Sequence, residues 1–144
     1  MSDQGQARTG VSDMGDEASG GGFPFLDHIG LVVREYGPDG SVCALTIAPM
    51  HMNSTGRVHG AVLFALADTG MGAALTPTLA RDQACATVEL KINYFKPVRA
   101  GELTCTTQVV NRGRTLANME SSIYLDQVLV ARANGTFAIF ARSA

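Results

Sequence analysis

An aspartate stands inside the longest apolar stretch of the chain, which runs from Val58 to Ala80. If this stretch is a helix, the residues three, four and seven positions from Asp68 surround it, and all are small or apolar: Ala61, Phe64, Ala65, Met71, Gly72 and Leu75. A carboxylate in such surroundings must be paired, hydrogen-bonded or shifted in pKa. Asp68 is therefore either a structural partner for a loop or a basic group, or a reacting carboxylate in an active site.

The start of the same stretch offers a second chemical group, a set of backbone donors. Residues 53–61 read NSTGRVHGA, which places His59 and Gly60 in the first turn of the expected helix. The N–H groups of a first turn have no partner within the helix, and they suit an oxygen that gains negative charge. Gly60 carries no side chain to hinder that approach. The alternative is an ordinary helix start, with a turn at Gly56 and with Ser54 or Thr55 serving the loop.

These two features are too far apart to act on one atom within one chain. Asp68 lies eight residues after Gly60, which is about 12 Å along a helix axis. A reacting atom needs both groups within about 3 Å. If they act together, the start of one helix must face the middle of the helix in a second copy. This distance predicts an obligate two-fold dimer with two composite sites.

The elements that must position these groups can be predicted from the residue pattern. A short helical turn at 23–29 precedes a strand over 31–35, a turn at 37–40 and a return strand over 41–48. A polar loop leads into residues 60–75, which are apolar on every side of a helix. Alternating patterns then predict strands over 87–94, 103–109, 117–125 and 129–139, with a candidate bulge at Gly135. We expect an α+β fold in which a curved antiparallel sheet of about six strands wraps one central helix, the last four strands forming a meander.

Composition and charge limit the class of protein. The chain has 144 residues, a net charge of −2 and 46% hydrophobic residues, which fits one domain and lacks the basic stripe of a nucleic-acid binder. Residues 1–22 are rich in glycine and poor in apolar side chains, which predicts a disordered tail before a domain over 23–144. The tail does not have the pattern of a secretory signal, and Asp68 and Pro77 argue against a membrane span. We expect a cytoplasmic protein with no membrane partner.

Cysteine and histidine spacing predicts no metal site, and we expect no cofactor. Cys43, Cys85 and Cys105 form no CxxC pair and leave an odd thiol, as is usual in a reducing compartment. His28 and His51 have no ligand partner at helical or strand spacing, and we expect surface or loop positions for both. Neither Cys85 nor Cys105 is expected to be a nucleophile.

Several short motifs then combine into a resemblance. They are Asn53, Gly56, His59 and Gly60; Leu66, Ala67 and Asp68; the strand 87–94 with Pro97; and residues 113–116. From about Phe25 to Phe140 the chain resembles the hotdog-fold acyl-CoA thioesterases of the phenylacetate-degradation (PaaI-like) type, within the 4-hydroxybenzoyl-CoA thioesterase superfamily. The family usually has a second glycine after the His-Gly pair, where this chain has Ala61. The resemblance implies hydrolysis of a medium-chain or aromatic acyl-CoA by a homo-oligomer of such dimers. The alternatives are a single dimer and a homotetramer, a dimer of dimers, in either of two arrangements.

The resemblance also implies roles for five candidate catalytic residues. Asp68 would be the nucleophile, or the base that activates water, and Gly60 N–H of the partner subunit would polarise the thioester carbonyl. Asn53 would orient the water or the thioester, and His59 would be a positioning residue at the helix start. Thr87 falls where related enzymes place a hydroxyl beside the carboxylate.

Candidate substrate-binding residues follow from the charges of coenzyme A. Its phosphates require basic groups at the mouth of the site, and in related proteins the turn Arg112–Thr115, with Gly113 and Arg114, meets the nucleotide end. Lys96 and Arg99 are second candidates and Arg81 a weaker one, although charges at strand ends are usually only solvated. Phe64 and Met71 are expected to line the acyl pocket.

Two other functions are compatible with such a fold. One is a non-catalytic acyl-CoA binding protein, which would have little need for Asp68 on an apolar face. The other is an acyl-thioester hydratase or dehydratase, but His59 and Asp68 are nine residues apart on one helix, which does not resemble the hydratase motif.

Overall fold

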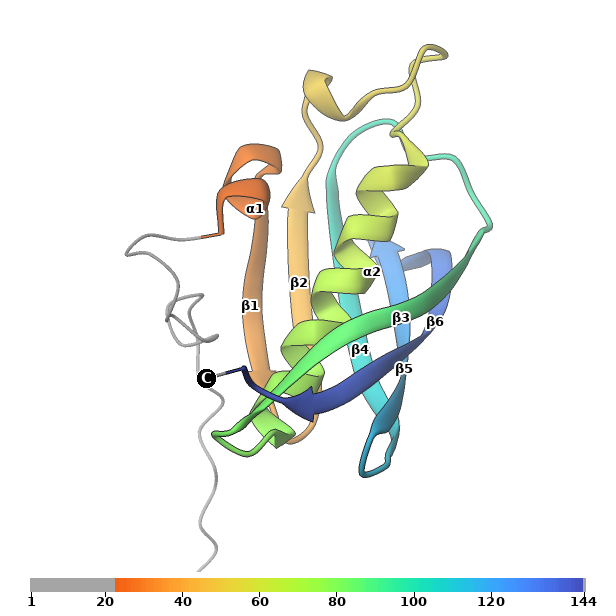
Figure 1. Ribbon diagram of the computed structural model, residues 1–144. Helices are drawn as coiled ribbons and strands as arrows, with labels where there is room; N and C mark the ends of the chain where they lie inside the picture. Colours follow the sequence, from red (N-terminus) through yellow and green to blue (C-terminus); the bar gives the residue numbers. More distant parts are fainter. Residues whose placement is uncertain (1–22, 144) are drawn as a thin grey trace, which may run out of the picture.

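A six-stranded antiparallel sheet wraps one long helix in the computed structural model, which describes residues 23–143 (Figure 1). The elements are α1 (Pro24–Ile29), β1 (Leu31–Gly37), β2 (Gly40–Thr46), the 3-10 turn η2 (Pro49–His51), α2 (Gly60–Leu75), the 3-10 turn η3 (Thr76–Thr78), β3 (Gln83–Tyr94), β4 (Glu102–Arg112), β5 (Leu116–Leu125) and β6 (Val128–Ala141). The predicted α+β hotdog architecture is confirmed, and the predicted central helix has the observed bounds. The tail expected at residues 1–22 lies outside the described residues.

The order of strands differs from the expected meander. The sheet runs β1-β2-β4-β5-β6-β3, so of the last four strands only β4, β5 and β6 follow one another as neighbours. β3 crosses over and pairs with β6, which leaves its outer edge without a strand partner in the described chain (Figure 1). Alternation along a strand shows which face is buried but not which strand lies beside it, and the prediction was wrong for that reason.

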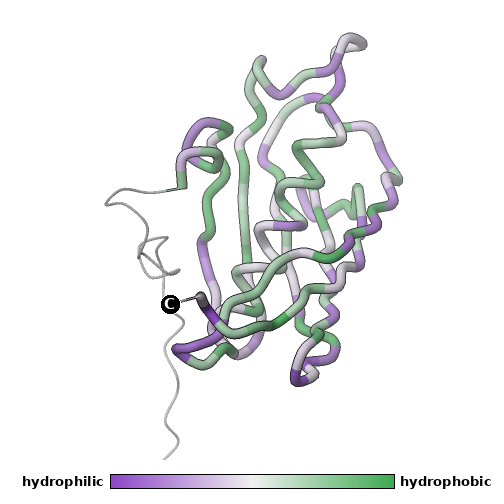
Figure 2. The backbone as a smooth tube through the Cα atoms, viewed as in Figure 1, coloured by the Kyte–Doolittle hydropathy of each residue, from purple (hydrophilic) through white to green (hydrophobic). Residues whose placement is uncertain are grey.

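Because α2 carries apolar residues on every side, it lies inside the curved sheet. The helix contacts all six strands, and its buried residues are Leu63, Leu66, Ala67, Gly70, Met71, Ala73, Ala74 and Leu75. Figure 2 shows hydrophilic residues gathered mainly in the turns, with hydrophobic residues along much of α2 and the strands. The stretch Gly60–Thr78 has the length and mean hydropathy, 1.2, of a membrane-spanning helix. Such values are also expected of the core helix of a domain, and that is how α2 packs here.

A cluster of buried hydroxyl groups lies between the sheet and α2. Ser41 Oγ donates to the carbonyl oxygen of Gly70 at 2.6 Å, and the hydroxyls of Thr107 and Ser121 are 2.6 Å apart. Ser121 Oγ also donates to the carbonyl oxygen of Ala67 at 3.4 Å. A Cβ atom on Gly70 would lie 2.5 Å from Thr107 Oγ1, so only glycine allows α2 to approach this cluster. The Thr107 and Ser121 hydroxyls therefore satisfy each other, and Ser41 and Ser121 anchor the helix on either side of Asp68.

Two expectations about the strands are corrected. Gly135 is not a bulge, because it pairs regularly with Leu90 and Met119, and the space of its missing Cβ is occupied by the Met71 sulfur. A bulge occurs instead at Val88 in β3, between Thr87 and Glu89. This extra residue breaks the predicted alternation and leaves Val88 60% exposed.

The contact at Gly70 predicts a difference between two glycines of the same helix. Gly70→Ala and Gly72→Ala gain the same helix propensity, but only the first places a Cβ against Thr107, since the nearest atom to a Cβ on Gly72 is 4.0 Å away. We expect Gly70→Ala to lower the free energy of unfolding by about 1–3 kcal/mol relative to Gly72→Ala. Urea unfolding at one protein concentration measures this difference, and equal stability of the two variants would contradict it.

Candidate active site

Asp68 meets Thr87 across the gap between α2 and β3. Thr87 Oγ1 donates to Asp68 Oδ1 at 2.7 Å, and the second carboxylate oxygen has no hydrogen-bond partner among residues 23–143. Asp68 is half-buried, and no salt bridge to it occurs in the described part of the chain. It also lies in mid-helix, where it caps no loop. Within residues 23–143, Asp68 therefore neither caps a loop nor pairs with a basic group. Its second carboxylate oxygen is available to react.

The N-terminus of α2 leaves one backbone donor available. His59 is the N-cap residue: its Nδ1 accepts the N–H of Ala61 at 2.9 Å, and its carbonyl oxygen accepts the N–H of Val62 at 2.9 Å. Gly60 N–H has no partner among residues 23–143. Because Nδ1 is an acceptor, the proton of the neutral imidazole sits on Nε2. The geometry fits the positioning role expected of His59 and the donor role expected of Gly60.

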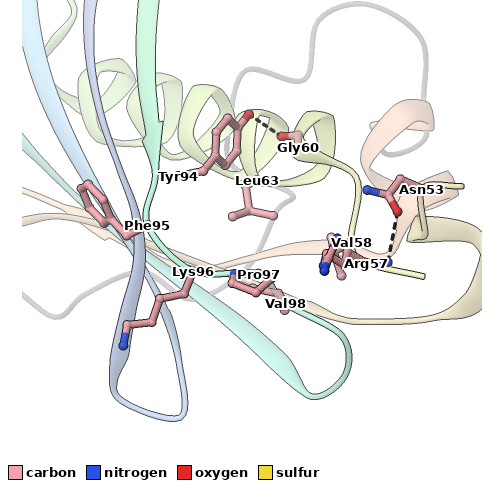
Figure 3. Close-up of a pocket in the computed structure, with 10 residues that line it drawn as sticks. All are labelled: Asn53, Arg57, Val58, Gly60, Leu63, Tyr94, Phe95, Lys96, Pro97 and Val98. Atoms are coloured by element: carbon pink, nitrogen blue, oxygen red, sulfur yellow. Dashed lines mark hydrogen bonds between the residues drawn. The ribbon is translucent and has the colours of Figure 1, made fainter. Parts of the chain in front are cut away.

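Tyr94, the last residue of the strand predicted over 87–94, also belongs to this region. Its hydroxyl donates to the carbonyl oxygen of Gly60 at 2.8 Å (Figure 3). A Cβ on Gly60 would lie 2.9 Å from the same hydroxyl, so the approach requires glycine. Burial raises the pKa of Tyr94, which keeps the hydroxyl protonated as a donor. The clue in the sequence was the tyrosine at the end of the strand that carries Thr87.

The side chain of Asn53 shapes the loop before α2. Its Oδ1 accepts the N–H of Thr55, the hydroxyl of Thr55 and the N–H of Arg57, at 2.9, 2.9 and 3.1 Å. The carbonyl end of this amide is therefore occupied by the loop itself. The amide nitrogen lies on the side of Gly60 and Leu63 and is the end of Asn53 that can meet a substrate (Figure 3).

A pocket of about 380 Å³ opens beside the start of α2. It is lined by Asn53, Arg57, Val58, Gly60, Leu63, Tyr94, Phe95, Lys96, Pro97 and Val98 (Figure 3). Arg57 and Lys96 bring two positive charges to an otherwise largely apolar pocket; Lys96 was expected from the sequence and Arg57 was not. Asp68 and Thr87 do not line this pocket. One chain thus holds the two parts of the candidate site in separate places.

The remaining predicted binding residues have different surroundings. The guanidinium of Arg112 donates to Thr78 O, Thr78 Oγ1, Gly113 O and Gln83 Oε1 at 2.8–3.4 Å, which ties the loop after α2 to the β4–β5 turn. Arg114, Thr115, Arg99 and Arg81 are exposed. A phosphate-binding role for the basic side chains stays a prediction.

The two expected acyl-pocket residues differ in exposure. Phe64 is 38% exposed, whereas Met71 is 0% exposed and packs against Gly135. Met71 is a core residue in the single chain, because the helix face that carries it turns toward β6, and its part in an acyl pocket stays a prediction.

The cysteines do not supply a nucleophile. All three are free thiols, and burial raises the pKa of Cys43 to about 12 and that of Cys105 to about 11. Burial also raises the pKa of Cys85. These thiols stay protonated near neutral pH. Among residues 23–143, no group of three His, Cys, Asp or Glu side chains could hold a metal ion.

Comparison with known proteins identifies the family. The model of the thioesterase superfamily matches residues 55–131, and the chain belongs to this superfamily. A candidate esterase of Pseudomonas aeruginosa is 33% identical over 116 residues, 79% of this chain and 87% of that protein. Mouse acyl-coenzyme A thioesterase 13 is 30% identical over 81 residues, 56% of this chain and 57% of that enzyme.

The solved structures agree with this assignment. A single-residue mutant of the phenylacetic acid degradation protein PaaI from Thermus thermophilus superimposes with a TM-score of 0.75 at 27% identity, over 81% of this chain and 98% of that one. The protein described here is therefore a thioester hydrolase with the hotdog fold.

The bond between Thr87 and Asp68 predicts a hydroxyl requirement for thioester hydrolysis. A hydrogen bond to a charged group contributes about 1.5–3 kcal/mol, so Thr87→Ala should lower kcat by about tenfold or more. Thr87→Ser keeps the hydroxyl and should retain most of the rate. Steady-state kinetics of the two variants test this, and equal loss in both would show that the methyl group matters rather than the hydroxyl.

Proposed function

We propose that this protein hydrolyses an acyl-CoA thioester, with a medium-chain or aromatic acyl group, to the free acid and coenzyme A. The observation that carries the proposal is the Asp68 carboxylate, which is held by Thr87 through one oxygen and presents the other. The resemblance to PaaI-like enzymes and the name of the mouse relative support coenzyme A as the thiol.

The reaction uses Asp68 in one of two ways. In one, the carboxylate attacks the thioester carbon, a C–O bond forms, the C–S bond breaks, and water then hydrolyses the acyl-aspartate. In the other, the carboxylate takes a proton from the water that attacks the same carbon. In both, coenzyme A leaves as a thiolate that takes up a proton, and Gly60 N–H stabilises the negative charge on the carbonyl oxygen.

A homodimer completes the site in this proposal. Within the described part of the chain the outer edge of β3 has no strand partner. Large apolar side chains are exposed on β3, just beyond it and on α2: Val88, Tyr94, Phe95 and Phe64. An open edge beside exposed apolar groups favours pairing with another chain. Two copies with their β3 edges together and their α2 helices antiparallel bring Gly60 of one subunit beside Asp68 of the other.

The same arrangement suggests where coenzyme A binds and how the dimers associate. Arg57 and Lys96 stand at the pocket beside Gly60, where they can meet the phosphates, with the Arg112–Thr115 turn of the second subunit as a further contact. Leu116 and Phe140, exposed on neighbouring strands β5 and β6, support association of two dimers into a tetramer. Three free cysteines suit a cytoplasmic location.

Loss of the carboxylate tests the proposed activity directly. With phenylacetyl-, benzoyl- and hexanoyl-CoA as substrates, Asp68→Asn should lower the release of free coenzyme A by at least about 100-fold while the protein stays folded and oligomeric. The order of rates for the wild type names the acyl class. If neither protein cleaves these thioesters but both bind them, a non-catalytic acyl-CoA binding function replaces this proposal.

A charge at the β3 edge tests the composite site. Val88→Lys places one lysine from each subunit near the two-fold axis of the proposed dimer, where the two positive charges repel each other. We therefore expect monomers in sedimentation velocity and loss of thioester hydrolysis. Val32→Lys is the matched control, because Val32 is an exposed valine on β1, the opposite edge of the sheet. An active monomeric Val88→Lys protein would overturn the two-subunit site.

A further inference from the structure

The loop between β2 and α2 carries Asn53 and ends at Gly60, yet little regular structure holds it. Its only regular elements are η2 and an isolated bridge between Met52 and Val58. His51 lies at the centre of this loop with 4% of its surface exposed. The sequence predicted a surface or loop position, and the residue is in a loop but not on the surface.

All the polar groups of His51 are hydrogen-bonded within the described chain. Its backbone N–H donates to Ala48 O at 3.0 Å, and its carbonyl oxygen accepts the N–H of His59 at 2.8 Å. Ring Nδ1 accepts the N–H of Ala48 at 2.8 Å, and Nε2 lies 2.7 Å from Ile29 O. One residue therefore links the end of α1, the exit from β2 and the entrance to α2.

These bonds determine the state of the imidazole. Nδ1 faces an N–H and must accept, while Nε2 faces a carbonyl oxygen and must donate. Only the neutral ring with its proton on Nε2 satisfies both contacts. His51 therefore has no lone pair available for a substrate, and its chemistry is entirely that of a fixed connector.

The hydrogen bonds of His51 link it to two proposed catalytic groups, Gly60 N–H and the Asn53 side chain. His59 N–H, bound to His51 O, lies one residue before the N–H of Gly60. In the other direction Asn53 follows His51 by two residues, with its side chain fixed by Thr55 and Arg57. A shift of His51 thus moves the peptide that carries Gly60 N–H and the start of the Asn53 turn together.

We propose that His51 is a positioning residue for thioester hydrolysis, which aims Gly60 N–H and the Asn53 amide at the substrate. This inference rests on the proposed function. A positioning residue differs from an ordinary buried residue because its substitution lowers the reaction rate of the folded protein. A displacement of about 1 Å at a catalytic group can lower the rate by about 100-fold. The effect should appear in kcat more than in KM, since the oxyanion donor acts mainly in the transition state.

Three substitutions test the two hydrogen bonds of the His51 ring separately. His51→Asn keeps an acceptor near the position of Nδ1, His51→Gln keeps a donor near Nε2, and His51→Phe keeps the ring volume with neither. We expect His51→Phe to lose about 10- to 100-fold in kcat with KM within about threefold, and at least one of the amide variants to recover part of that loss. Exposed His28→Phe is the matched control and should leave kcat unchanged.

A readout independent of activity is the amide resonance of Gly60 in a ¹⁵N-labelled protein. It should shift in His51→Phe and less in the better amide variant, with the resonances of the β4–β6 strands unmoved.

If the Gly60 resonance does not shift, or if kcat of the folded His51 variants stays within about threefold of wild type, His51 has no positioning role. If His51→Phe does not fold, the amide variants decide by the same two readouts. If wild type fails to hydrolyse any acyl-CoA, the proposed function fails, and the Gly60 resonance still tests the coupling.

Discussion

The close approach of α2 to the concave face of the sheet is the constraint on which the other features depend. A helix that is apolar on every side must be covered on most of them, and one sheet can do this only by curling around it. The approach is close because Gly70 has no side chain where Thr107 lies, and because Gly135 leaves room for Met71. The hydroxyls that meet the Ala67 and Gly70 carbonyls set the rotation of α2 about its axis.

This rotation leaves one strip of α2 outside the sheet, and the candidate reactive groups lie along it. Phe64 and Asp68 are on this strip, and Gly60 is at its end. β3 borders the strip, and its outer edge has no strand partner among residues 23–143, so the surface proposed to carry the chemistry also offers contacts for a second chain. The structure thus connects the burial of one helix, the open strand edge and the separation of the carboxylate from the backbone donor.

Hydrogen bonds from distant segments decide the conformation at the start of α2. The hydroxyl of Tyr94 binds the Gly60 carbonyl from β3, His51 holds the loop to α1, and His59 caps the helix. Together they occupy the neighbouring polar groups and leave Gly60 N–H without a protein partner among residues 23–143. A donor kept open in this way needs no rearrangement before it meets a carbonyl oxygen.

The sequence by itself determined the central helix, the number of strands and the candidate residues Asp68 and Gly60, because these depend on periodicity and on local chemistry. It also determined that one chain separates those two residues, since helix rise is constant. Only the tertiary structure decided that β3 pairs with β6, that Met71 is in the core, and that Tyr94, Arg57 and His51 surround the helix start. Such contacts join segments far apart in the chain, and the residue pattern within one strand or loop carries no information about its distant neighbour.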